Sequence, residues 1–243
     1  MSFRLGLLNP NTDRHHTDAM AGVARAALPA GCDVLAVTAP RGPSSIESAA
    51  DTVAAAVEVA GMVRAHPDAD AYLIACFGDP GLHAARELTT VPVVGIGEAA
   101  YIAAGLVAGR FAVITTLRRG IPDLEDAIAA HGAAARCAGV LPLDIPVAEQ
   151  GAAFPDTTDA IVAASRRAVQ ELGADALILA CGGMADVARA VQEAVGVPVC
   201  DGVAFGSLLA HGLWRTGLAT SKTGTFAAPE RIPYVGMPSP SGA

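Results

Sequence analysis

An internal repeat is the sequence feature that most constrains how this chain can fold. Residues 69–78 read ADAYLIACFG and residues 174–183 read ADALILACGG, so six of ten positions are identical at an offset of 105 residues. Each copy continues into a segment of helical length and then into Val-Pro-Val, with the proline 16 residues after the cysteine in the first copy and 17 in the second. A duplicated unit of this kind predicts two related halves.

Short aliphatic and β-branched segments alternate with alanine-rich segments along the whole chain. We expect strands at residues 4–8, 33–37, 71–75, 93–96, 111–115, 176–180 and 197–200. We expect helices at residues 13–28, 47–65, 81–88, 98–107, 121–131, 156–172, 184–194 and 203–214. This alternation is typical of α/β proteins with mainly parallel sheets.

Together with the repeat, the alternation predicts two pseudo-symmetric Rossmann-like lobes with an active site between them. The first lobe is expected to span residues 1–98 and to be completed by residues 206–243, and the second to span residues 99–205. The segment after Gly217 is rich in Gly, Pro, Ser and Thr, so we expect it to wrap the surface without regular structure.

Composition excludes several classes of protein. The net charge is −8, no basic run occurs, and only ten aromatic residues are present (six Phe, three Tyr, one Trp), which argues against nucleic-acid binding. The longest apolar stretches, such as residues 99–109, are shorter than the ~20 residues that span a bilayer. The first residues lead into an expected strand and do not resemble a signal peptide. We therefore expect a cytoplasmic protein that binds a small molecule.

Five cysteines occur, an odd number, and no CxxC pair is among them, so a disulfide framework is not expected. Cys76 and Cys181 stand apart because they occupy the same place in the repeat, directly after an apolar strand and before glycine and a helix. Cys32, Cys137 and Cys200 have no such partner, and we interpret them as structural residues.

The position of the two paired cysteines points to chemistry. The carboxyl ends of parallel strands open onto the ligand crevice, and the backbone N–H groups of the following turn favour negative charge. We therefore expect lowered thiol pKa values for Cys76 and Cys181. A buried cysteine is ordinarily a small hydrophobe, but two at matching strand ends of facing lobes would flank one cleft. One thiolate and one thiol on opposite sides could invert a stereocentre without a cofactor or metal.

Proton removal next to a carbonyl creates an enolate, whose oxygen needs hydrogen-bond donors. The strand-end motifs offer backbone N–H groups, two threonine hydroxyls and one asparagine amide. The predicted substrate-binding residues are Asn9, Phe77, Gly78, Thr115, Thr116, Gly182 and Gly183.

With these residues in place, the sequence closely resembles the hydantoin racemases of the aspartate/glutamate racemase superfamily over nearly the whole chain. The motifs that carry the resemblance are Asn-Pro-Asn-Thr at 9–12, Gly-Pro-Ser-Ser-Ile-Glu-Ser at 42–48, Cys-Phe-Gly-Asp-Pro-Gly at 76–81, Val-Gly-Ile-Gly-Glu-Ala at 94–99, Cys-Gly-Gly-Met at 181–184, Asp-Gly-Val at 201–203 and Thr-Ser-Lys at 220–222.

The resemblance implies two Rossmann-like lobes, no cofactor, a homo-oligomer, and Cys76 and Cys181 acting alternately as base and acid. The related arylmalonate decarboxylases typically keep one of the two cysteines, so the presence of both favours racemisation. Maleate isomerases share the fold and also use cysteines, and that activity stays open. So does a two-lobed ligand-binding protein without enzymatic activity.

The strand-end motifs also bear on the substrate, because they contain no Arg or Lys that would hold a free carboxylate. Arg118 and Arg119 follow Thr116 and could point inward or to solvent. A neutral cyclic imide fits such a site better than an amino acid, so we expect a 5-substituted hydantoin. Allantoin, itself a 5-ureidohydantoin, and Asp/Glu-type amino acids are the alternatives, and the loop at residues 41–48 could set the size of the substituent.

Three weaker signals have ordinary interpretations. Residues 95–100 match GxGxxA, but no acidic residue ends the next strand, so helix–strand packing is favoured over a dinucleotide site. His15 and His16 are adjacent and would point to different faces of a helix, so we expect both at the solvated surface. His83 is expected to be exposed or partly buried on its helix.

Three carboxylates, Glu47, Asp79 and Asp201, follow or precede expected strand and helix ends. We expect them to orient loops through hydrogen bonds to the backbone.

Overall fold

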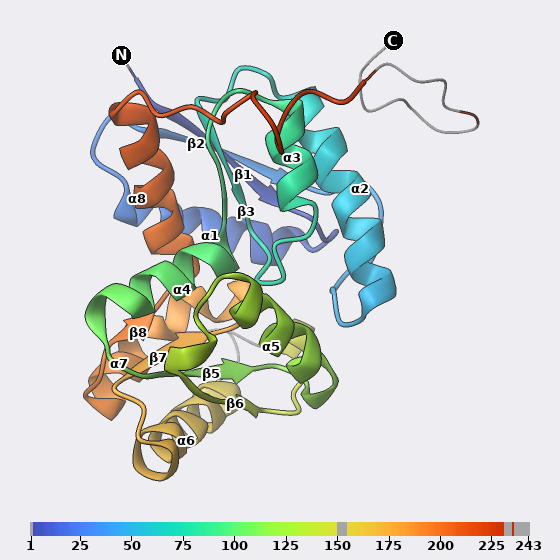
Figure 1. The fold of residues 1–243 in the computed structure, drawn as a ribbon. Helices are drawn as coiled ribbons and strands as arrows, with labels where there is room; N and C mark the ends of the chain where they lie inside the picture. The colour runs from blue at the N-terminus through green and yellow to red at the C-terminus, as the bar shows by residue number, and fades with distance from the viewer. Residues whose placement is uncertain (1, 150–154, 231–234, 236–243) are drawn as a thin grey trace.

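The two predicted halves are present as two lobes, each built around a parallel sheet, in a computed structural model that describes residues 2–149, 155–230 and 235 (Figure 1). The first sheet contains β1 (Arg4–Asn9), β2 (Asp33–Thr38), β3 (Ala71–Ile74) and β4 (Val93–Gly95). The second contains β5 (Phe111–Thr115), β6 (Cys137–Pro142), β7 (Ala176–Leu179) and β8 (Val199–Cys200). The strand orders, β2-β1-β3-β4 and β6-β5-β7-β8, are the same, which confirms the α/β class and the duplication.

Helices follow nearly every strand. They are α1 (Arg14–Ala27), α2 (Ala49–Ala65), α3 (Leu82–Leu88), α4 (Ile96–Val107), α5 (Ile121–Ala130), α6 (Pro155–Leu172), α7 (Ala188–Val195) and α8 (Gly202–Arg215). Short 3-10 helices are η1 (Arg118–Gly120), η2 (Ala134–Arg136), η3 (Val147–Glu149) and η4 (Gly182–Val187). The helix expected at residues 184–194 is therefore divided into η4 and α7, and β6 was not predicted.

The two lobes share one hydrophobic core. A single buried cluster contains Leu7 and Leu73 of the first sheet and Val113 and Ile178 of the second. Helices α4 and α8 pack against each other, α4 also contacts β7 and β8, and α8 contacts β1, β3 and β4. A Cβ at Gly202 would collide with the Ile96 carbonyl, so only glycine lets the first turns of α8 and α4 meet. This packing holds the carboxyl ends of the two sheets in a fixed relation.

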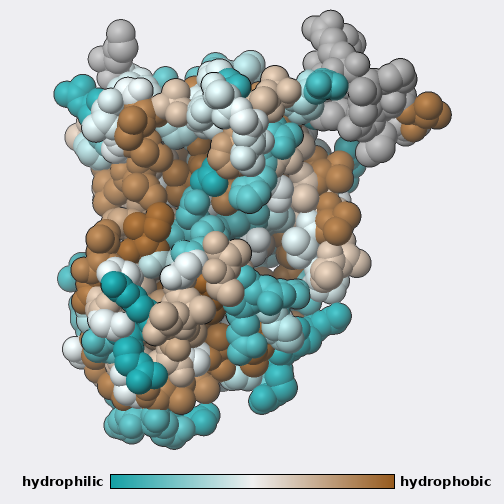
Figure 2. Space-filling view, viewed as in Figure 1, coloured by the Kyte–Doolittle hydropathy of each residue, from teal (hydrophilic) through white to brown (hydrophobic). Residues whose placement is uncertain are grey.

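The same two helices leave apolar side chains at the surface. Exposed residues include Ile102, Leu106 and Val107 of α4 and Leu208 of α8, and Figure 2 shows a hydrophobic area over the edge where these helices lie. Apolar side chains gathered on one face are typical of a contact surface. The homo-oligomer implied by the resemblance stays a prediction.

The C-terminal segment wraps the first lobe without regular structure, as expected, as far as residue 230. Thr220 donates from its backbone N–H to the Thr90 carbonyl (2.8 Å), and Lys222 Nζ donates to the carbonyls of Arg86 (2.6 Å) and Glu87 (3.1 Å) at the end of α3. Residues 231–234 and 236–243 of this segment lie outside the described residues. No helix among the described residues is long and apolar enough to cross a membrane.

Candidate active site

A cavity of about 150 Å³ lies between the carboxyl ends of the two sheets. The turns after β3 and β7 line it with residues 75–78 and 180–183, and residues 115–117, at the end of β5 and just beyond it, form another part of the wall. Because β3 and β7 hold the same place in their sheets, the duplication brings Cys76 and Cys181 to one cavity from opposite lobes.

The two cysteine turns lie close to each other. The position that a Cβ of Gly182 would take lies 3.6 Å from the carbonyl oxygen of Ala75, the residue before Cys76. The two sulfurs are also close enough for a negative charge on Cys181 to raise the pKa of Cys76. Proximity of this kind lets the ionisation state of one thiol depend on the other.

The thiol pKa values differ from the sequence-based expectation. Burial raises the pKa of Cys76 to about 12 and that of Cys181 to about 11. The predicted backbone effect exists, since the N–H of Gly78 acts on Cys76 and those of Gly183 and Met184 act on Cys181, each lowering the pKa. The expectation of lowered pKa values was wrong because loss of hydration in the cavity outweighs these N–H groups.

Most of the predicted binding residues meet at the cavity. Those that line it are Phe77, Gly78, Thr115, Thr116, Gly182 and Gly183. Asn9 does not line it: the residue is fully buried, and its Nδ2 donates to Asn11 Oδ1 (2.7 Å) and Thr17 Oγ1 (2.9 Å). Asn11, two residues further on, takes the place at the cavity wall.

His16 corrects a second expectation. It was expected at the solvated surface, but it is 5% exposed and lines the cavity, whereas His15 is exposed. Its Nδ1 lies 3.2 Å from Asp13 Oδ2. The sequence held a usable signal, because His16, Met20 and Ala24 recur every four residues and form one buried face of α1.

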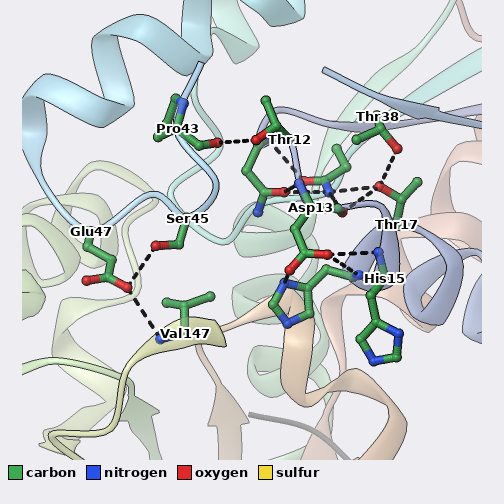
Figure 3. A network of polar contacts seen from close by, with 12 residues as sticks. Thr12, Asp13, His15, Thr17, Thr38, Pro43, Ser45, Glu47 and Val147 are labelled. Carbon is green, nitrogen blue, oxygen red and sulfur yellow. Dashed lines mark hydrogen bonds and ion pairs between the residues drawn. The ribbon is translucent and has the colours of Figure 1, made fainter. Parts of the chain in front are cut away.

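Glu47 reaches from the loop before α2 to the second lobe, and Figure 3 shows it between Ser45 and Val147. Its Oε1 accepts hydrogen bonds from Ser45 Oγ (2.9 Å) and from the backbone N–H of Val147 (3.4 Å). Glu47 therefore orients its loop, as expected, and it also lines the cavity together with Asp123, which the sequence analysis did not single out.

Asp79 explains the glycines of the GxGxxA segment. Its carboxylate accepts hydrogen bonds from the N–H groups of Gly97 (3.0 Å) and Glu98 (2.7 Å), which begin α4, and a Cβ at Gly95 would collide with that carboxylate. Burial raises the pKa of Asp79 to about 7, although the hydrogen bonds from these two N–H groups act to lower it. The glycines thus permit close packing of turn and helix. This supports the packing interpretation of the segment.

The remaining sequence candidates lie elsewhere. Asp201 caps α8 by accepting hydrogen bonds from the N–H groups of Val203 (2.8 Å) and Ala204 (3.1 Å). His83 packs edge-on against Phe226 with ring centroids 5.6 Å apart. The cysteines outside the cavity lining, all packed against the core, are Cys32, Cys137 and Cys200. Within the part of the chain that the structure describes, no cluster of three or more His, Cys, Asp or Glu residues could hold a metal ion.

Comparison with known proteins identifies the family. A family model described as Asp/Glu/Hydantoin racemase matches residues 5–209, which include both sheets and both cavity cysteines. The chain belongs to this family. By this membership it is an isomerase of the racemase type, and the relationship expected from the sequence motifs is confirmed.

Several relatives align with this racemase over nearly its whole length. Hydantoin racemase from Pseudomonas sp. (strain NS671) is 36% identical over 96% of this chain and 94% of its own length. Hydantoin racemase from Rhizobium meliloti is 39% identical over 92% of this chain and 93% of its own. The solved structure of allantoin racemase from Klebsiella pneumoniae superposes with a TM-score of 0.94 at 38% identity, covering 99% of each chain.

Proposed function

We propose that this racemase inverts the C5 stereocentre of a hydantoin ring, using Cys76 and Cys181 and no cofactor. One thiolate takes the C5 proton from one face and becomes a thiol, leaving an enolate. The other thiol returns its own proton to C5 on the opposite face and becomes a thiolate. The observation that carries this proposal is the meeting of the two repeated cysteine turns, one from each lobe, at a single cavity.

The charges around the cavity support a neutral substrate. Its lining includes the carboxyl groups of Glu47 and Asp123, and no Arg or Lys is among the described residues that line it. Arg118 and Arg119 are exposed, and Arg118 pairs with Asp144 at 3.2 Å. An amino-acid carboxylate would meet repulsion without a partner here. A hydantoin ring presents only carbonyl and N–H groups.

The size of the cavity favours a compact substituent at C5. Pockets for drug-sized ligands enclose roughly 300–1,000 Å³, whereas this cavity has a volume of about 150 Å³. The named relatives are hydantoin racemases and an allantoin racemase at comparable identity, and both substrates contain the same ring. We therefore propose allantoin and hydantoins with short alkyl groups as the preferred substrates.

The enolate oxygen needs donors other than those that act on the sulfurs. The N–H groups of Gly78 and Gly183 are directed at the thiols, so they are less suited to the oxyanion than the sequence suggested. Thr115 and Thr116 line the cavity, and each side chain carries a hydroxyl that can donate a hydrogen bond. We assign these hydroxyls to the enolate oxygen.

Exchange in D₂O tests the proposal. One enantiomer of allantoin, or of 5-methylhydantoin, is incubated with the enzyme without added cofactor, and optical rotation and deuterium content are followed together. Two bases on opposite faces label the inverted product early and leave recovered substrate largely unlabelled. Equal early labelling of substrate and product would contradict the two-cysteine mechanism. The ring assignment requires loss of optical rotation with at least one of the two substrates, and an unchanged rotation with both would contradict it.

A further inference from the structure

His16 is held in place by the first turn of its own helix. Asp13 caps α1, and its Oδ1 accepts hydrogen bonds from the N–H groups of His15 (2.8 Å) and His16 (3.3 Å), as Figure 3 shows for the carboxylate and the helix start. The other carboxylate oxygen, Oδ2, lies 3.2 Å from His16 Nδ1. A carboxylate on Nδ1 fixes the proton there and leaves Nε2 as the basic nitrogen.

The opposite edge of the ring faces the turn that carries Cys181. A Cβ added to Gly183 would lie 3.1 Å from His16 Nε2 and 3.6 Å from Cys181 Sγ. The basic nitrogen and the sulfur therefore border the same small space, which is open because residue 183 has no side chain. His16 comes from the first lobe and Cys181 from the second, so the fold of the whole chain creates this neighbourhood.

Two charged groups among the described residues act on Cys76. The charged groups that act on it are Cys181 and Asp79, and both disfavour its thiolate. Among the described residues that line the cavity, His16 is the single imidazole. Two carboxyl groups belong to this part of the cavity. Asp13 lies at Nδ1 of His16, and the charge of Glu47 raises the pKa of Cys181. Helix η4, which packs against α1, carries Asp186, and the negative charge of Asp186 raises the pKa of Asp201.

We propose that His16 is a positioning residue that makes Cys181 the resting base of the enzyme. The proton of the Cys181 thiol moves to His16 Nε2, which leaves a thiolate beside an imidazolium whose second N–H faces the Asp13 carboxylate. No charge is created overall, because one proton passes between two neutral groups. The pair offsets part of the hydration that Cys181 loses on burial.

The consequence for catalysis rests on the two-cysteine mechanism proposed above. The two enantiomers of a hydantoin with an achiral substituent have equal free energies, so kcat/KM must be the same in both directions. The free enzyme exists in two forms, one with the thiolate on Cys76 and one with the thiolate on Cys181, and each form accepts one enantiomer. If one form predominates, the two enantiomers have unequal KM values, and their kcat values differ by the same ratio. Removing His16 is expected to change the ratio of the two KM values and the ratio of the two kcat values by the same factor.

Thiol alkylation tests the proposal without depending on activity. Wild type, His16→Asn and the control His15→Asn are treated with iodoacetamide over a range of pH, and labelling rates of the Cys181 and Cys76 peptides are read by mass spectrometry. Asparagine keeps a donor for Asp13 but has no basic nitrogen. We expect Cys181 to react about tenfold more slowly at neutral pH in His16→Asn, equivalent to one pKa unit. Cys76 in that variant should keep its rate or react faster, because less negative charge then lies on Cys181. Both cysteines in His15→Asn should keep their rates.

An unchanged Cys181 rate in His16→Asn would overturn the proposal, and so would an equal slowing of Cys76, since that would be a general structural effect. Should His16→Asn fail to fold, Gly183→Ala decides the question, because its methyl group enters the space between Nε2 and Sγ. A shift of the pH dependence of Cys181 labelling to higher pH, with none for Cys76, supports the proposal there, and an unchanged pH dependence contradicts it. If His16→Asn slows labelling of Cys181 alone but the wild type racemises neither hydantoin in D₂O, the proposed function is contradicted and this inference stands.

Discussion

At the scale of single residues, the two cavity thiols are chemically unequal although the repeat makes their surroundings alike. Burial raises the pKa of Cys76 to about 12 and that of Cys181 to about 11, and the turn after Cys181 supplies two N–H groups where the turn after Cys76 supplies one. Cys181 is therefore the first of the two to ionise as the pH rises. When one of the two thiols is ionised, the negative charge is expected mainly on Cys181.

Replacing either cysteine by alanine should abolish racemisation, because each variant lacks a proton carrier on one face. The expected loss in kcat is about 10²–10⁴-fold for Cys76→Ala and for Cys181→Ala, the range for a positioned acid or base. Cys137→Ala, a half-buried cysteine outside the cavity, is the control and should keep its activity. Racemisation is followed by optical rotation, and near-normal activity in either cavity variant would contradict the paired mechanism.

Thr115→Val removes the hydroxyl assigned to the enolate oxygen and keeps the shape of the side chain. Loss of one donor at a developing oxyanion typically lowers kcat about 10²–10³-fold. We expect a fall in kcat with little change in KM, since the oxygen gains its charge only in the transition state. Steady-state kinetics with a folded variant, verified by circular dichroism, measures this, and an increase in KM alone would assign Thr115 to ground-state binding.

At the scale of elements, the sequence predicts most strands and helices because their apolar residues are local and continuous. β5 is predicted with its observed bounds, and β1, β3 and β7 differ only at their carboxyl ends. β6 is not predicted from the sequence, and it is an irregular strand. All six of its residues are half-buried, and Gly139 has a φ of 154°. The pairing of β6 with β5 is also irregular near Phe111. The segment is apolar, but Gly139 and Pro142 interrupt the β-branched and aliphatic pattern that marks the central strands.

Asp79→Ala should destabilise the junction between the Cys76 turn and α4. Its carboxyl accepts two N–H groups at the helix start, and losing such a cap costs about 1–2 kcal/mol. Burial raises the pKa of Asp79 from 3.8 to about 7, so the folded protein holds this proton where the unfolded chain has lost it. The contribution of Asp79 to stability is thus complete below 3.8 and is lost as the pH rises to about 7.

The destabilisation by Asp79→Ala should therefore be larger at about pH 5 than at about pH 8. Urea unfolding at both values measures the free energy of unfolding. Asp126→Ala, an exposed position on α5, is the control and should change that free energy by no more than about 0.5 kcal/mol at either pH. A difference for Asp79→Ala that grows with pH would contradict the assigned ionisation.

At the scale of the whole molecule, the sequence places both cysteines at one cleft because the duplication is visible in the chain. The four-residue spacing in α1 indicates that His16 is buried, but the sequence does not show that η4, from the other half of the chain, packs against this helix. Nor does it reveal that Glu47 contacts Val147, a residue 100 positions away. The pattern of one segment does not show which residues of the other lobe it will contact, so these parts of the site require the assembled fold.

The Glu47–Val147 hydrogen bond joins the two lobes at the wall of the cavity. Glu47 and Val147 both line the cavity, and the hydrogen bond between them ties the loop at residues 41–48 to the second lobe. Glu47→Ala removes this tie and also shortens a side chain at the cavity wall. If the cavity of about 150 Å³ sets the proposed preference for compact C5 substituents, the variant should accept larger ones.

The measurement is the ratio of kcat/KM for 5-benzylhydantoin to kcat/KM for 5-methylhydantoin. One hydrophobic group admitted or refused by a pocket is worth about 1–3 kcal/mol, so the ratio should rise about 10-fold or more in Glu47→Ala. Glu47→Gln keeps the acceptor for Val147 and the length of the side chain, so its ratio should stay near that of the wild type. A ratio that rises equally in both variants would assign the effect to the charge of Glu47, and an unchanged ratio in Glu47→Ala would show that another part of the wall limits substrate size.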